Sequence, residues 1–597
     1  MATPFGAAVD SAGSPHLLRP GLSGFRTFLE PTRRAWCATA RTQHVNQSAR
    51  RRGPHAVPHF TYPELPLDGL LRRAAARDPH APALTTGRGT VTYGQLDAHA
   101  DRIARFLARA VGRRGAVVGV ANTLDPVFPA AYYGTSRSGN TVALINPLVN
   151  EHALHHVCAA AGVEIALVPA ATGEQLMKMR DRLPLLHTIV VTDADHAVVP
   201  GDTVPLHVAL DETPDGPYER DEPAAVDPSS VVCIQFTTGT TGRPKGVRLT
   251  HRNLVANATQ TALAQSLGCG SVTLNHLPLF HVMHLNSAVC AGASQVLCHD
   301  PDPVASLALA AREGATHYYG LPARLHRLAD DPRLTTACEG VPAGPRLTAV
   351  MSGGTALAPT AARRLRQALG VPVVQGYGLA ELSPLSHMQR PADPAVRGAV
   401  GPPLPGTECR VVDLGSREPV AVWATGEVQV RGPQVMAGYL NDDEPSRIDA
   451  DGWFSTGDAG WLDEDGRLFL VDRLGDVFKY DNELVSPTGV ERIIAEDPRV
   501  AECVVVGWPD AVHGAVVWAG IVLRDPTGTA RRAAYTGLDT LDALDAVAEE
   551  ANRRLAPFER IRRVEALDAV PRTPTGKPER QALRQKVRAL AAAEAAA

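Results

Sequence analysis

Runs of apolar residues alternate with amphipathic segments along much of the chain. Segments 126–138 and 151–161 space their apolar side chains in the way that forms one face of a helix. Short apolar runs separate these helices, at 116–120, 141–145, 165–168 and 188–191. Because strands that alternate with helices of ten or more residues form parallel sheets with helical crossovers, the pattern predicts an α/β fold.

The same pattern can be followed on both sides of this stretch. A short amphipathic helix is expected at 67–76, a strand at 89–93 and a helix at 97–110. Residues 201–229 are rich in Asp, Pro and Glu, so they are expected to form a loop. A further helix is expected from 251 to 265.

The pattern at the end of the chain predicts a separate small α+β domain. Apolar runs at 501–507, 516–523 and 563–566 predict strands, and 541–555 predicts an amphipathic helix. The Ala-rich residues 579–597 are expected to be helical and then frayed.

Length and composition limit the possible classes. A chain of 597 residues is too long for one core, so two or more domains are expected. The net charge of -4 and the 5% aromatic content give no reason to expect a nucleic-acid partner. Nine Cys without a Cys-x-x-Cys pair indicate reduced thiols in a cytoplasm, and no apolar run is long enough for a membrane span.

Residues 1–57 differ from the rest. They hold eight Arg against only Asp10 and Glu30, with many Ser, Gly, Pro and Ala and no sustained periodicity. An Arg-rich, acid-poor leader can be a mitochondrial transit peptide. We expect instead a disordered extension, or translation from an upstream start codon, because the Ala, Arg, Gly and Pro bias continues through the whole chain.

The segment 237–245 holds four Thr, two Gly and a Lys in nine residues, directly after the apolar strand 231–236. Glycines let backbone N–H groups converge on one point, and such a concavity binds anions. Thr hydroxyls add donors, and Lys245 adds a mobile positive charge. A flexible surface turn would explain Gly and Pro but not four hydroxyls beside a Lys. The segment therefore predicts a polyphosphate site, although the Gly-x4-Gly-Lys-Ser/Thr loop of mononucleotide NTPases does not fit it.

Two later stretches could hold the rest of a nucleotide. At 350–355 an apolar strand runs into Gly353 and Gly354, where the lack of side chains lets a flat group lie against the backbone. At 371–381 a second strand leads to the ring of Tyr377 and the carboxylate of Glu381. The ring can stack on or cover a nucleoside, and the carboxylate suits a hard cation such as magnesium.

Three more stretches carry polar groups at turns. At 453–458 a Gly turn ends in Asp458, and one carboxylate can accept hydrogen bonds from two vicinal hydroxyls. At 472–487 Arg473 supplies a planar fork for ribose or phosphate oxygens. At 571–577 two Pro and a Gly surround Lys577, which is more than a structural lysine needs.

Together these stretches resemble the motifs of the adenylate-forming superfamily: acyl- and aryl-CoA synthetases, peptide-synthetase adenylation domains and luciferases. The resemblance covers roughly residues 60 to 590. It implies a large N-terminal domain of mixed and parallel sheets with a β-barrel-like subdomain, and a small mobile α+β C-terminal domain. The implied boundaries are 58–472 for the adenylation domain, 473–475 for the hinge, 476–590 for the small domain and 591–597 for a frayed tail.

The resemblance also implies a role for each matching residue. The residues expected at the ATP phosphates are Thr237, Thr238, Gly239, Thr240, Thr241, Gly242 and Lys245. Those expected at adenine and ribose are Gly353, Gly354, Thr355, Gln375, Gly376, Tyr377, Asp458 and Arg473. Those expected to line the acyl pocket are His281, Val282, Met283, His284, Gly378, Leu379 and Ala380. Catalytic roles fall to Lys577, Thr238, Glu381 and Lys479, with Glu381 also the magnesium ligand and Gly475 the hinge position.

The acyl-pocket motif at 277–285 includes two histidines three residues apart. His281 and His284 could be a metal pair or satisfied core histidines, but no third candidate ligand is close in sequence. The resemblance implies that His281 closes one side of the carboxylate pocket. His284 stands where the family has Gly, so its ring would fill space and favour a short or polar-edged acid.

Other departures from the family pattern concern the phosphate side and the acceptor side. Ala380 replaces a Thr whose hydroxyl lies near the phosphate in the family, and we interpret this as an adjustment of the activity and not as its loss. Gly475 replaces Lys or Asp at the hinge, Asn482 replaces Gly and Gly489 replaces Glu. Gly permits a swivel, and Asn tolerates left-handed backbone, but its side chain could narrow a pantetheine tunnel. These three positions leave the second substrate less certain than the first.

The predicted function is AMP-forming ligation of a small carboxylic acid with ATP, Mg²⁺ and CoA. The alternative keeps the adenylate but passes the acyl group to an amine, a carrier-protein thiol or another small nucleophile. Oxidation of the adenylate, as in luciferases, has no support beyond the shared family. A pseudoenzyme is encouraged only by Ala380, against the presence of Lys245, Glu381, Asp458 and Lys577.

Overall fold

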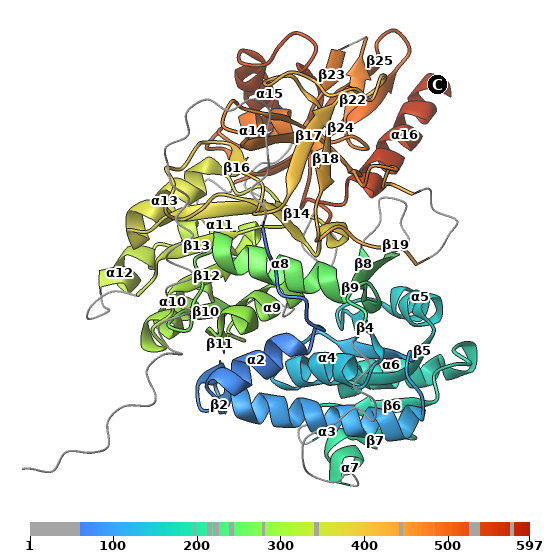
Figure 1. Ribbon diagram of the computed structural model, residues 1–597. Coiled ribbons are helices and arrows are strands. Elements are labelled where there is room, and N and C mark those ends of the chain that lie inside the picture. The colour runs from blue at the N-terminus through green and yellow to red at the C-terminus, as the bar shows by residue number, and fades with distance from the viewer. Residues whose placement is uncertain are drawn as a thin grey trace, which may run out of the picture. The chain divides into compact units, whose positions relative to one another are not determined.

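The computed structural model describes residues 60–194, 199–211, 218, 226–237, 244–276, 281–339, 346–440, 446–481, 483–524, 538–572 and 578–596. The chain divides into two units, 1–56 and 57–597, and the first lies wholly outside the described residues. The expected extension 1–57 is therefore outside them as well. Within the second unit, the described strands form four sheets (Figure 1).

The first sheet has eight strands in the order β15-β14-β13-β12-β10-β11-β1-β2. Its six inner strands are parallel, and an antiparallel strand closes each edge. The bounds are β1 (Pro82–Thr86), β2 (Gly89–Thr92), β10 (Val272–Asn275), β11 (Ser294–Leu297), β12 (His317–Gly320), β13 (Ala349–Ser352), β14 (Val373–Gly378) and β15 (Leu385–Met388).

The second sheet also has eight strands, in the order β19-β9-β8-β4-β3-β5-β6-β7. Strands β8 to β7 in that order are parallel, whereas β9 and β19 are antiparallel additions at one edge. The bounds are β3 (Val117–Ala121), β4 (Thr141–Ile145), β5 (Val163–Val168), β6 (Thr188–Val191), β7 (Val204–Pro205), β8 (Val231–Thr237), β9 (Lys245–Thr250) and β19 (Gly438–Tyr439).

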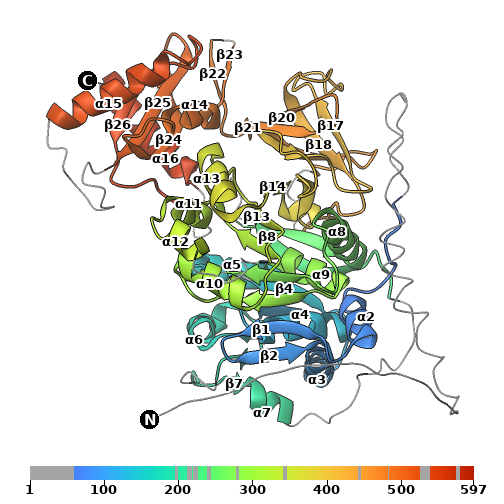
Figure 2. The same cartoon turned by 90° about the vertical axis from the view of Figure 1, so that its left-hand side faces the viewer.

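Helices cover both sheets in layers, as Figures 1 and 2 show. One buried apolar cluster joins strands of both sheets through α2 (Gly69–Arg77), α3 (Tyr93–Val111), α4 (Val127–Arg137), α8 (His251–Ala264) and α9 (Val282–Ala291). A second cluster packs the first sheet on α10 (Pro303–Arg312), α11 (Pro322–Asp330), α12 (Leu334–Glu339) and α13 (Pro359–Leu369). A third packs the second sheet on α5 (Glu151–Ala161) and α6 (Ala170–Lys178). The order helix, sheet, helix, sheet, helix is the layered α/β arrangement that the alternating sequence pattern predicts.

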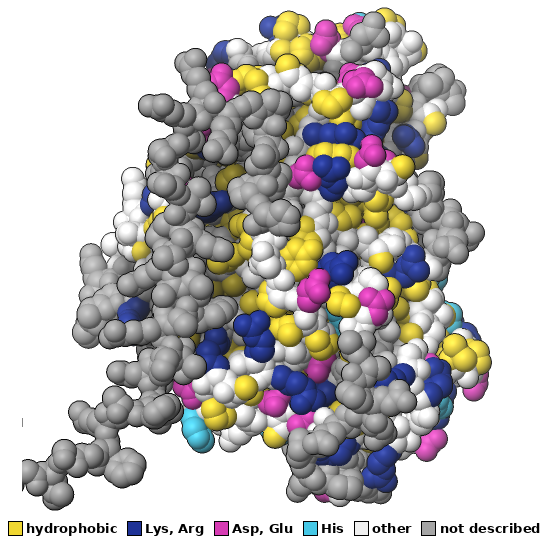
Figure 3. Space-filling view, in the orientation of Figure 1, with side chains coloured by type: hydrophobic (Ala, Val, Ile, Leu, Met, Phe, Trp, Pro, Cys, Tyr) yellow, Lys and Arg dark blue, Asp and Glu magenta, His cyan; other side chains and the backbone are white. Residues whose placement is uncertain are grey.

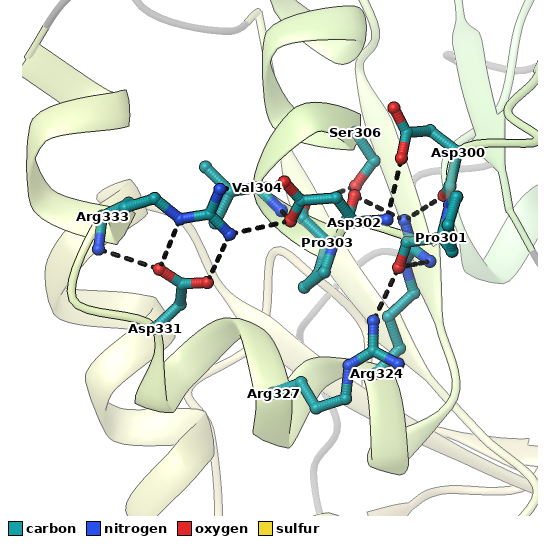
Figure 4. Close-up of polar contacts among 10 residues, drawn as sticks. All are labelled: Asp300, Pro301, Asp302, Pro303, Val304, Ser306, Arg324, Arg327, Asp331 and Arg333. Carbon is teal, nitrogen blue, oxygen red and sulfur yellow. Dashed lines mark hydrogen bonds and ion pairs between the residues drawn. The ribbon is translucent and has the colours of Figure 1, made fainter. Parts of the chain in front are cut away.

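Three arginines fix the connection from β11 to α10 beside the start of α11 (Figure 4). Arg324 donates to the carbonyls of Asp300 and Asp302, at 2.9 and 3.0 Å, and Arg327 donates to the carbonyl of Pro301 at 2.6 Å. Arg333 reaches both carboxylate oxygens of Asp302 at 3.0 Å. Because α11 follows directly on β12, these bonds also fix the carboxyl end of that strand.

The third sheet has five antiparallel strands, in the order β16-β21-β20-β18-β17, in the part expected to be barrel-like. Their bounds are β16 (Ala399–Gly401), β17 (Glu408–Val412), β18 (Gly426–Arg431), β20 (Phe454–Leu462) and β21 (Leu468–Arg473). Over β17 and β18, Figure 3 shows basic, acidic and hydrophobic side chains close together. The Trp453 ring lies 4.3 Å from the Arg410 guanidinium and 4.6 Å from that of Arg431. These contacts fix the entry to β20.

The small C-terminal domain has a sheet of β23-β22-β25-β24, with β26 parallel to β25. The strands are β22 (Phe478–Tyr480), β23 (Glu483–Val485), β24 (Val500–Asp510), β25 (Gly514–Leu523) and β26 (Ile561–Ala566). The helices are α14 (Pro487–Ile494), α15 (Leu538–Asn552) and α16 (Arg580–Ala596). Apolar residues of α14 and α15 pack on one face of the sheet and Leu583 and Val587 of α16 pack on the other, which gives the predicted α+β domain.

Two local predictions were wrong. Helix α3 begins at Tyr93 and not at 97, because Thr92 and Gln95 form a capping box. The stretch 201–229 is not wholly loop: β7 pairs with β6, and α7 (Leu206–Asp211) follows it. At the other end, α16 continues to Ala596 through the residues expected to fray. Among the described residues, no helix has the length and apolar content needed to cross a bilayer.

Candidate active site

The expected nucleotide residues gather where parallel strands of the first sheet end. Ser352 at the end of β13 pairs with Gln375 of β14, so the Gly353–Gly354 step follows beside β14. Gly354 has a φ of +88°, a conformation that favours glycine. A side chain on Gly353 would point at the Gly376 carbonyl, 3.7 Å from the new carbon. The carboxyl ends of parallel strands are the usual place for a ligand in such folds, and here backbone is left open for a flat ring.

The ends of the predicted phosphate segment lie opposite each other in a hairpin of the second sheet. Thr237 of β8 pairs with Lys245 of β9. His156 of α5 contacts the Pro244 carbonyl at 2.9 Å and so fixes the second arm. Thr238, Gly239, Thr240, Thr241 and Gly242 lie outside the described residues. The described ends show that the antiparallel pair of β8 and β9 finishes at Thr237 and Lys245.

Asp458 is the centre of a buried polar group. The hydroxyl of Tyr377 donates to Asp458 Oδ2 at 2.6 Å, and Arg473 Nε lies 3.3 Å from Oδ1. Asp458 of β20 pairs with Arg473 of β21, and Asp458 is 5% exposed. Burial, and after it the Asp458 carboxylate, raises the pKa of Tyr377 well above its usual value. Tyr377 therefore stays a hydrogen-bond donor and keeps the carboxylate oriented.

Glu381 is held by a residue that sequence reasoning missed. Its Oε1 accepts a hydrogen bond of 2.9 Å from the hydroxyl of Tyr439, and the Lys245 ammonium lies 5.4 Å from the centre of the Tyr439 ring. Burial, followed by Glu381, raises the pKa of Tyr439. Tyr439 lies 58 residues beyond Glu381. Strand β19 brings it there by pairing with β9, a long-range contact for which the sequence has no local signal.

The histidines of the predicted acyl pocket are oriented in different ways. His281 caps α9, with Nδ1 accepting from the Met283 amide at 3.1 Å, and its Nε2 lies 3.4 Å from Gln235 Nε2. The His284 ring instead packs on Tyr319, with ring centres 4.0 Å apart. Burial lowers the pKa of His281 to about 4 and that of His284 to about 3, so both rings are neutral at pH 7. Gln235 and Tyr319 were not predicted, because they come from strands distant in sequence.

The other pocket residues are placed as follows. Val282 and Met283 begin α9, Gly378 ends β14, and Leu379 and Ala380 follow it. A side chain on Gly378 would meet the Pro384 carbonyl at 2.0 Å, so glycine is required there. Thr355 is exposed, and the Gln375 side chain accepts from the Leu357 amide at 2.8 Å. A side chain on Gly376 would meet Cδ1 of Leu385 at 2.9 Å, so the Leu385 side chain would have to shift.

Comparisons with known proteins bear directly on this arrangement. A family model described as "AMP-binding enzyme" matches residues 71–440. A second, "AMP-binding enzyme C-terminal domain", matches residues 489–577. The chain belongs to the AMP-binding enzyme family.

This AMP-binding enzyme is similar to 4-coumarate–CoA ligase 2 of Oryza sativa subsp. japonica, at 30% identity over 88% of the chain and 93% of that protein. It is also similar to the crystal structure of ATP-bound MatB from Rhodopseudomonas palustris, with a TM-score of 0.76, 26% identity, and 87% and 98% coverage. A third similar protein is the amide bond synthetase McbA from Marinactinospora thermotolerans, with a TM-score of 0.72, 25% identity, and 87% and 100% coverage.

The family resemblance and the fold class predicted from the sequence are confirmed, and the chain is an AMP-forming ligase by family. ATP is the nucleotide that this family match supports.

The residues predicted for the second half of the reaction lie in the C-terminal domain of this AMP-binding enzyme. Lys479 is exposed on β22, which forms a hairpin with β23. Asp481, at the turn, has a φ of +53° and pairs with His513 at 3.0 Å. The Tyr480 ring stacks on His513 with centres 4.3 Å apart. Asn482 and Lys577 lie outside the described residues. The predicted roles of Lys479 and Lys577 therefore stay predictions.

Proposed function

We propose that this AMP-binding enzyme activates a small carboxylic acid with ATP and transfers the acyl group to the thiol of CoA. In the first step a carboxylate oxygen attacks the α-phosphorus, the bond to the β-phosphate oxygen breaks, and pyrophosphate leaves. In the second step the thiol loses its proton and attacks the acyl carbon, and AMP leaves. The observation that carries the proposal is the buried Asp458 group of β20, which contacts Tyr377 of β14. Glu381 follows β14, and Gly353–Gly354 follows the neighbouring strand β13.

The Asp458 group supports a role in binding ribose. A vicinal diol offers two donors, and an oriented carboxylate accepts both. Tyr377 and Arg473 approach different oxygens of the Asp458 carboxylate and so orient it. Because Tyr377 is held protonated by burial, the carboxylate does not need to reorganise when the nucleotide arrives.

Charge is the main barrier to the first step, because two anions must approach each other. Lys245, the hydroxyls of 237–241 and Lys577 would neutralise the charge that develops on the phosphates. One pre-aimed donor of this kind contributes roughly 3 kcal/mol to a barrier.

Glu381 is the residue that would hold a magnesium ion near the phosphates. Tyr439 holds its Oε1, so the other carboxylate oxygen remains for a cation, and a hard oxygen donor suits Mg²⁺. Magnesium usually takes one or two protein carboxylates and completes its shell with phosphates and water. Bound there, it would add positive charge beside the phosphates.

The acid that best fits is short or carries a polar edge. The His284 ring fills the space beside Tyr319, and neutral His281 lies next to Gln235. A long alkyl chain would have to displace these rings. The similar rice protein acts on 4-coumarate by its name, which is an aryl acid of moderate size.

A non-CoA acceptor is the alternative, and two observations favour it. The amide bond synthetase McbA shows that an amine acceptor occurs on this fold. The hairpin of β22 and β23, which carries Lys479, has an acidic residue, Asp481, at its turn. The next residue, Asn482, stands where the family has Gly. An acidic turn suits an amine better than the phosphates of CoA.

The test is a pyrophosphate-release screen over short-chain, aryl and long-chain acids, followed by AMP release with and without CoA and with candidate amines. Acid-dependent pyrophosphate with CoA-stimulated AMP release is the expected result. AMP release that is stimulated by amines but not by CoA would show that the acceptor is an amine. No pyrophosphate with any acid would contradict the adenylation itself.

A further inference from the structure

Asp472 makes a side-chain contact between the third sheet and the small C-terminal domain. It lies next to last in β21, and its Oδ2 accepts from the Thr488 amide at 2.7 Å and from the Ser486 hydroxyl at 3.1 Å. Ser486 is also the N-cap of α14. The carboxylate therefore sits at the positive end of that helix, where a charge-assisted bond is strong.

Backbone anchors on each side confine the swivel between the two parts to a short segment. The Leu474 amide donates to the Gly457 carbonyl in β20 at 2.8 Å, so it is fixed to the third sheet. The Gly475 carbonyl accepts from Arg584 of α16 at 2.7 Å, so it is fixed to the small domain. The torsions between these two anchors lie within Leu474 and Gly475. The Arg473 carbonyl also accepts from the Asp476 and Val477 amides at 2.9 and 3.0 Å, so a large change of these torsions opens those bonds as well.

The acidic residues on the two sides of this swivel have different consequences. Asp476 pairs with Arg584 at 2.6 Å and lies 3.7 Å from Arg580, and all three belong to the small domain. Those pairs move with the domain when it turns. The bonds of Asp472 to Ser486 and Thr488 cross the swivel, so a large rotation has to break them.

Thr488 links this contact to the segment that carries Lys577. Arg580 donates to the Thr488 hydroxyl at 3.2 Å and pairs with Glu491. Arg580 is the first residue of α16 and follows Lys577 by three positions. Fixing the start of α14 to β21 thus fixes the start of α16, three residues after Lys577, relative to β21.

The described arrangement also places the base of the Lys577 segment near the first sheet. Arg572 and Pro578 form a bridge on either side of 573–577. The pKa of His326, in α11, is lowered by burial, with further contributions from Asp330, Arg572 and Glu502. Arg572 and Glu502, which pair with each other at 3.1 Å, therefore lie close enough to His326 to affect its pKa.

We propose that Asp472 is a positioning residue for the activation step. Through Thr488 and Arg580 it holds the small domain in the orientation that presents the Lys577 segment to the nucleotide. The bonds to Ser486 and Thr488 then open before the Lys479 hairpin takes that place. This inference rests on the proposed function, because it assigns the two lysines to successive steps.

The test compares the two half-reactions in Asp472→Ala, Asp472→Asn and the control Asp497→Asn, which loses an Asp–Arg pair within the small domain. Acid-dependent ATP–pyrophosphate exchange measures activation, and transfer from preformed acyl-adenylate to CoA measures the second step. For Asp472→Ala we expect about a tenfold loss of exchange with transfer unchanged or faster. Asp472→Asn keeps an acceptor for the Thr488 amide and should recover part of the loss.

Equal losses in both half-reactions, or unchanged exchange in a normally folded Asp472→Ala protein, would overturn the inference. Wild-type protein without any acid-dependent exchange would instead contradict the proposed function. If no exchange occurs, the role of Asp472 can still be tested by a measurement that does not depend on catalysis. Single-molecule energy transfer between dyes attached to p-azidophenylalanine at positions 414 and 512 reports the orientation of the small domain. Leu414 and Val512 are 48% and 80% exposed. We expect one dominant population in wild type and Asp497→Asn and several in Asp472→Ala. The same single population in all three would also reject the role of Asp472.

Discussion

The nucleotide side and the acceptor side of this AMP-binding enzyme are built in different ways. Asp458 and Glu381 are 5% and 8% exposed, and each accepts a hydrogen bond from a buried tyrosine hydroxyl. Lys479 and Asp481 are exposed on a three-residue strand and its turn, and Asp481 is paired only at the surface, with His513. Buried hydrogen-bonded groups are costly to change, whereas exposed pairs contribute little.

Three of the five departures from the family pattern, at positions 475, 482 and 489, concern the predicted acceptor side, and this contrast explains why that side tolerates them. A change at Asp458 would leave the Tyr377 hydroxyl and the Arg473 guanidinium without their partner. A change at position 481 leaves no buried group without a partner among the described residues. The buried contacts would therefore restrict changes on the proposed nucleotide side more than on the proposed acceptor side.

The largest expected effect is that of Lys577→Ala, which tests whether the nucleotide side needs a group from the small domain. The adenylation rate should fall at least about a hundredfold with ATP binding largely intact, because the lysine acts on charge that develops in the transition state. Single-turnover pyrophosphate release with acid measures the rate. Lys586→Ala is the matched control, since Lys586 pairs with Glu565 on the surface of α16. Weaker ATP binding with an unchanged rate would contradict the assigned role.

Asp458→Ala should have the next largest effect, and it acts on binding. Loss of a charged acceptor for two ribose hydroxyls should raise KM for ATP about ten- to a hundredfold. Tyr377→Phe keeps the carboxylate and removes only its orienting bond, so a rise of a few-fold is expected. Asp465→Ala, in the exposed hairpin turn, serves as control. Equal effects of Asp458→Ala and Asp465→Ala on KM would show that Asp458 does not touch the nucleotide.

How far the sequence predicts this site depends on the range of the contacts. Asp458 and Arg473 lie on adjacent strands of one hairpin, so a turn signal at 463–466 and a register suffice to bring them together. Tyr439 reaches Glu381 because β19 (Gly438–Tyr439) pairs with β9 (Lys245–Thr250), a strand far earlier in the chain. A single sequence has no local pattern for that pairing.

The fold shows the same limit. Strand β4 has the bounds predicted from its apolar run, 141–145, because it is buried between two parallel neighbours and reads as a continuous apolar segment. Strand β7 has two residues and was predicted as loop, since its pairing with β6 alone makes it a strand. Tyr93 was predicted as the last residue of a strand, with 93–96 leading into the helix, whereas the Thr92–Gln95 capping box makes it the first residue of α3.

The third prediction concerns how the buried His284 ring of the predicted acyl pocket makes the stability of the protein depend on pH. The pKa of His284 is about 3 in the folded protein and about 6.5 unfolded. Between these values the unfolded chain binds a proton that the folded protein does not, so stability falls as pH falls below about 6.5. The loss is about 1.4 kcal/mol per pH unit for one such histidine. His284→Phe keeps the contact with Tyr319 and removes the proton site.

Urea unfolding of wild type and His284→Phe at pH 7.0 and pH 5.5 measures this difference. The variant should lose about 1.4 kcal/mol less than wild type over that interval. His281→Asn should act in the same direction, because burial lowers the pKa of His281 to about 4 and Asn can still cap α9. Identical losses in all three proteins would show that these rings are not buried as neutral groups.

The smallest expected effect is that of His513→Ala, on the acceptor side. His513 pairs with Asp481 and stacks on Tyr480, so its removal loosens the hairpin that carries Lys479. An exposed pair contributes at most about 1 kcal/mol, which corresponds to a two- to fivefold slower transfer from acyl-adenylate to the acceptor. Adenylation should not change, because the nucleotide residues keep all their partners. Asp481→Asn should reproduce the transfer defect, since it weakens the same pair. A loss of adenylation equal to the loss of transfer would mean that the Lys479 hairpin and the buried nucleotide residues do not act separately.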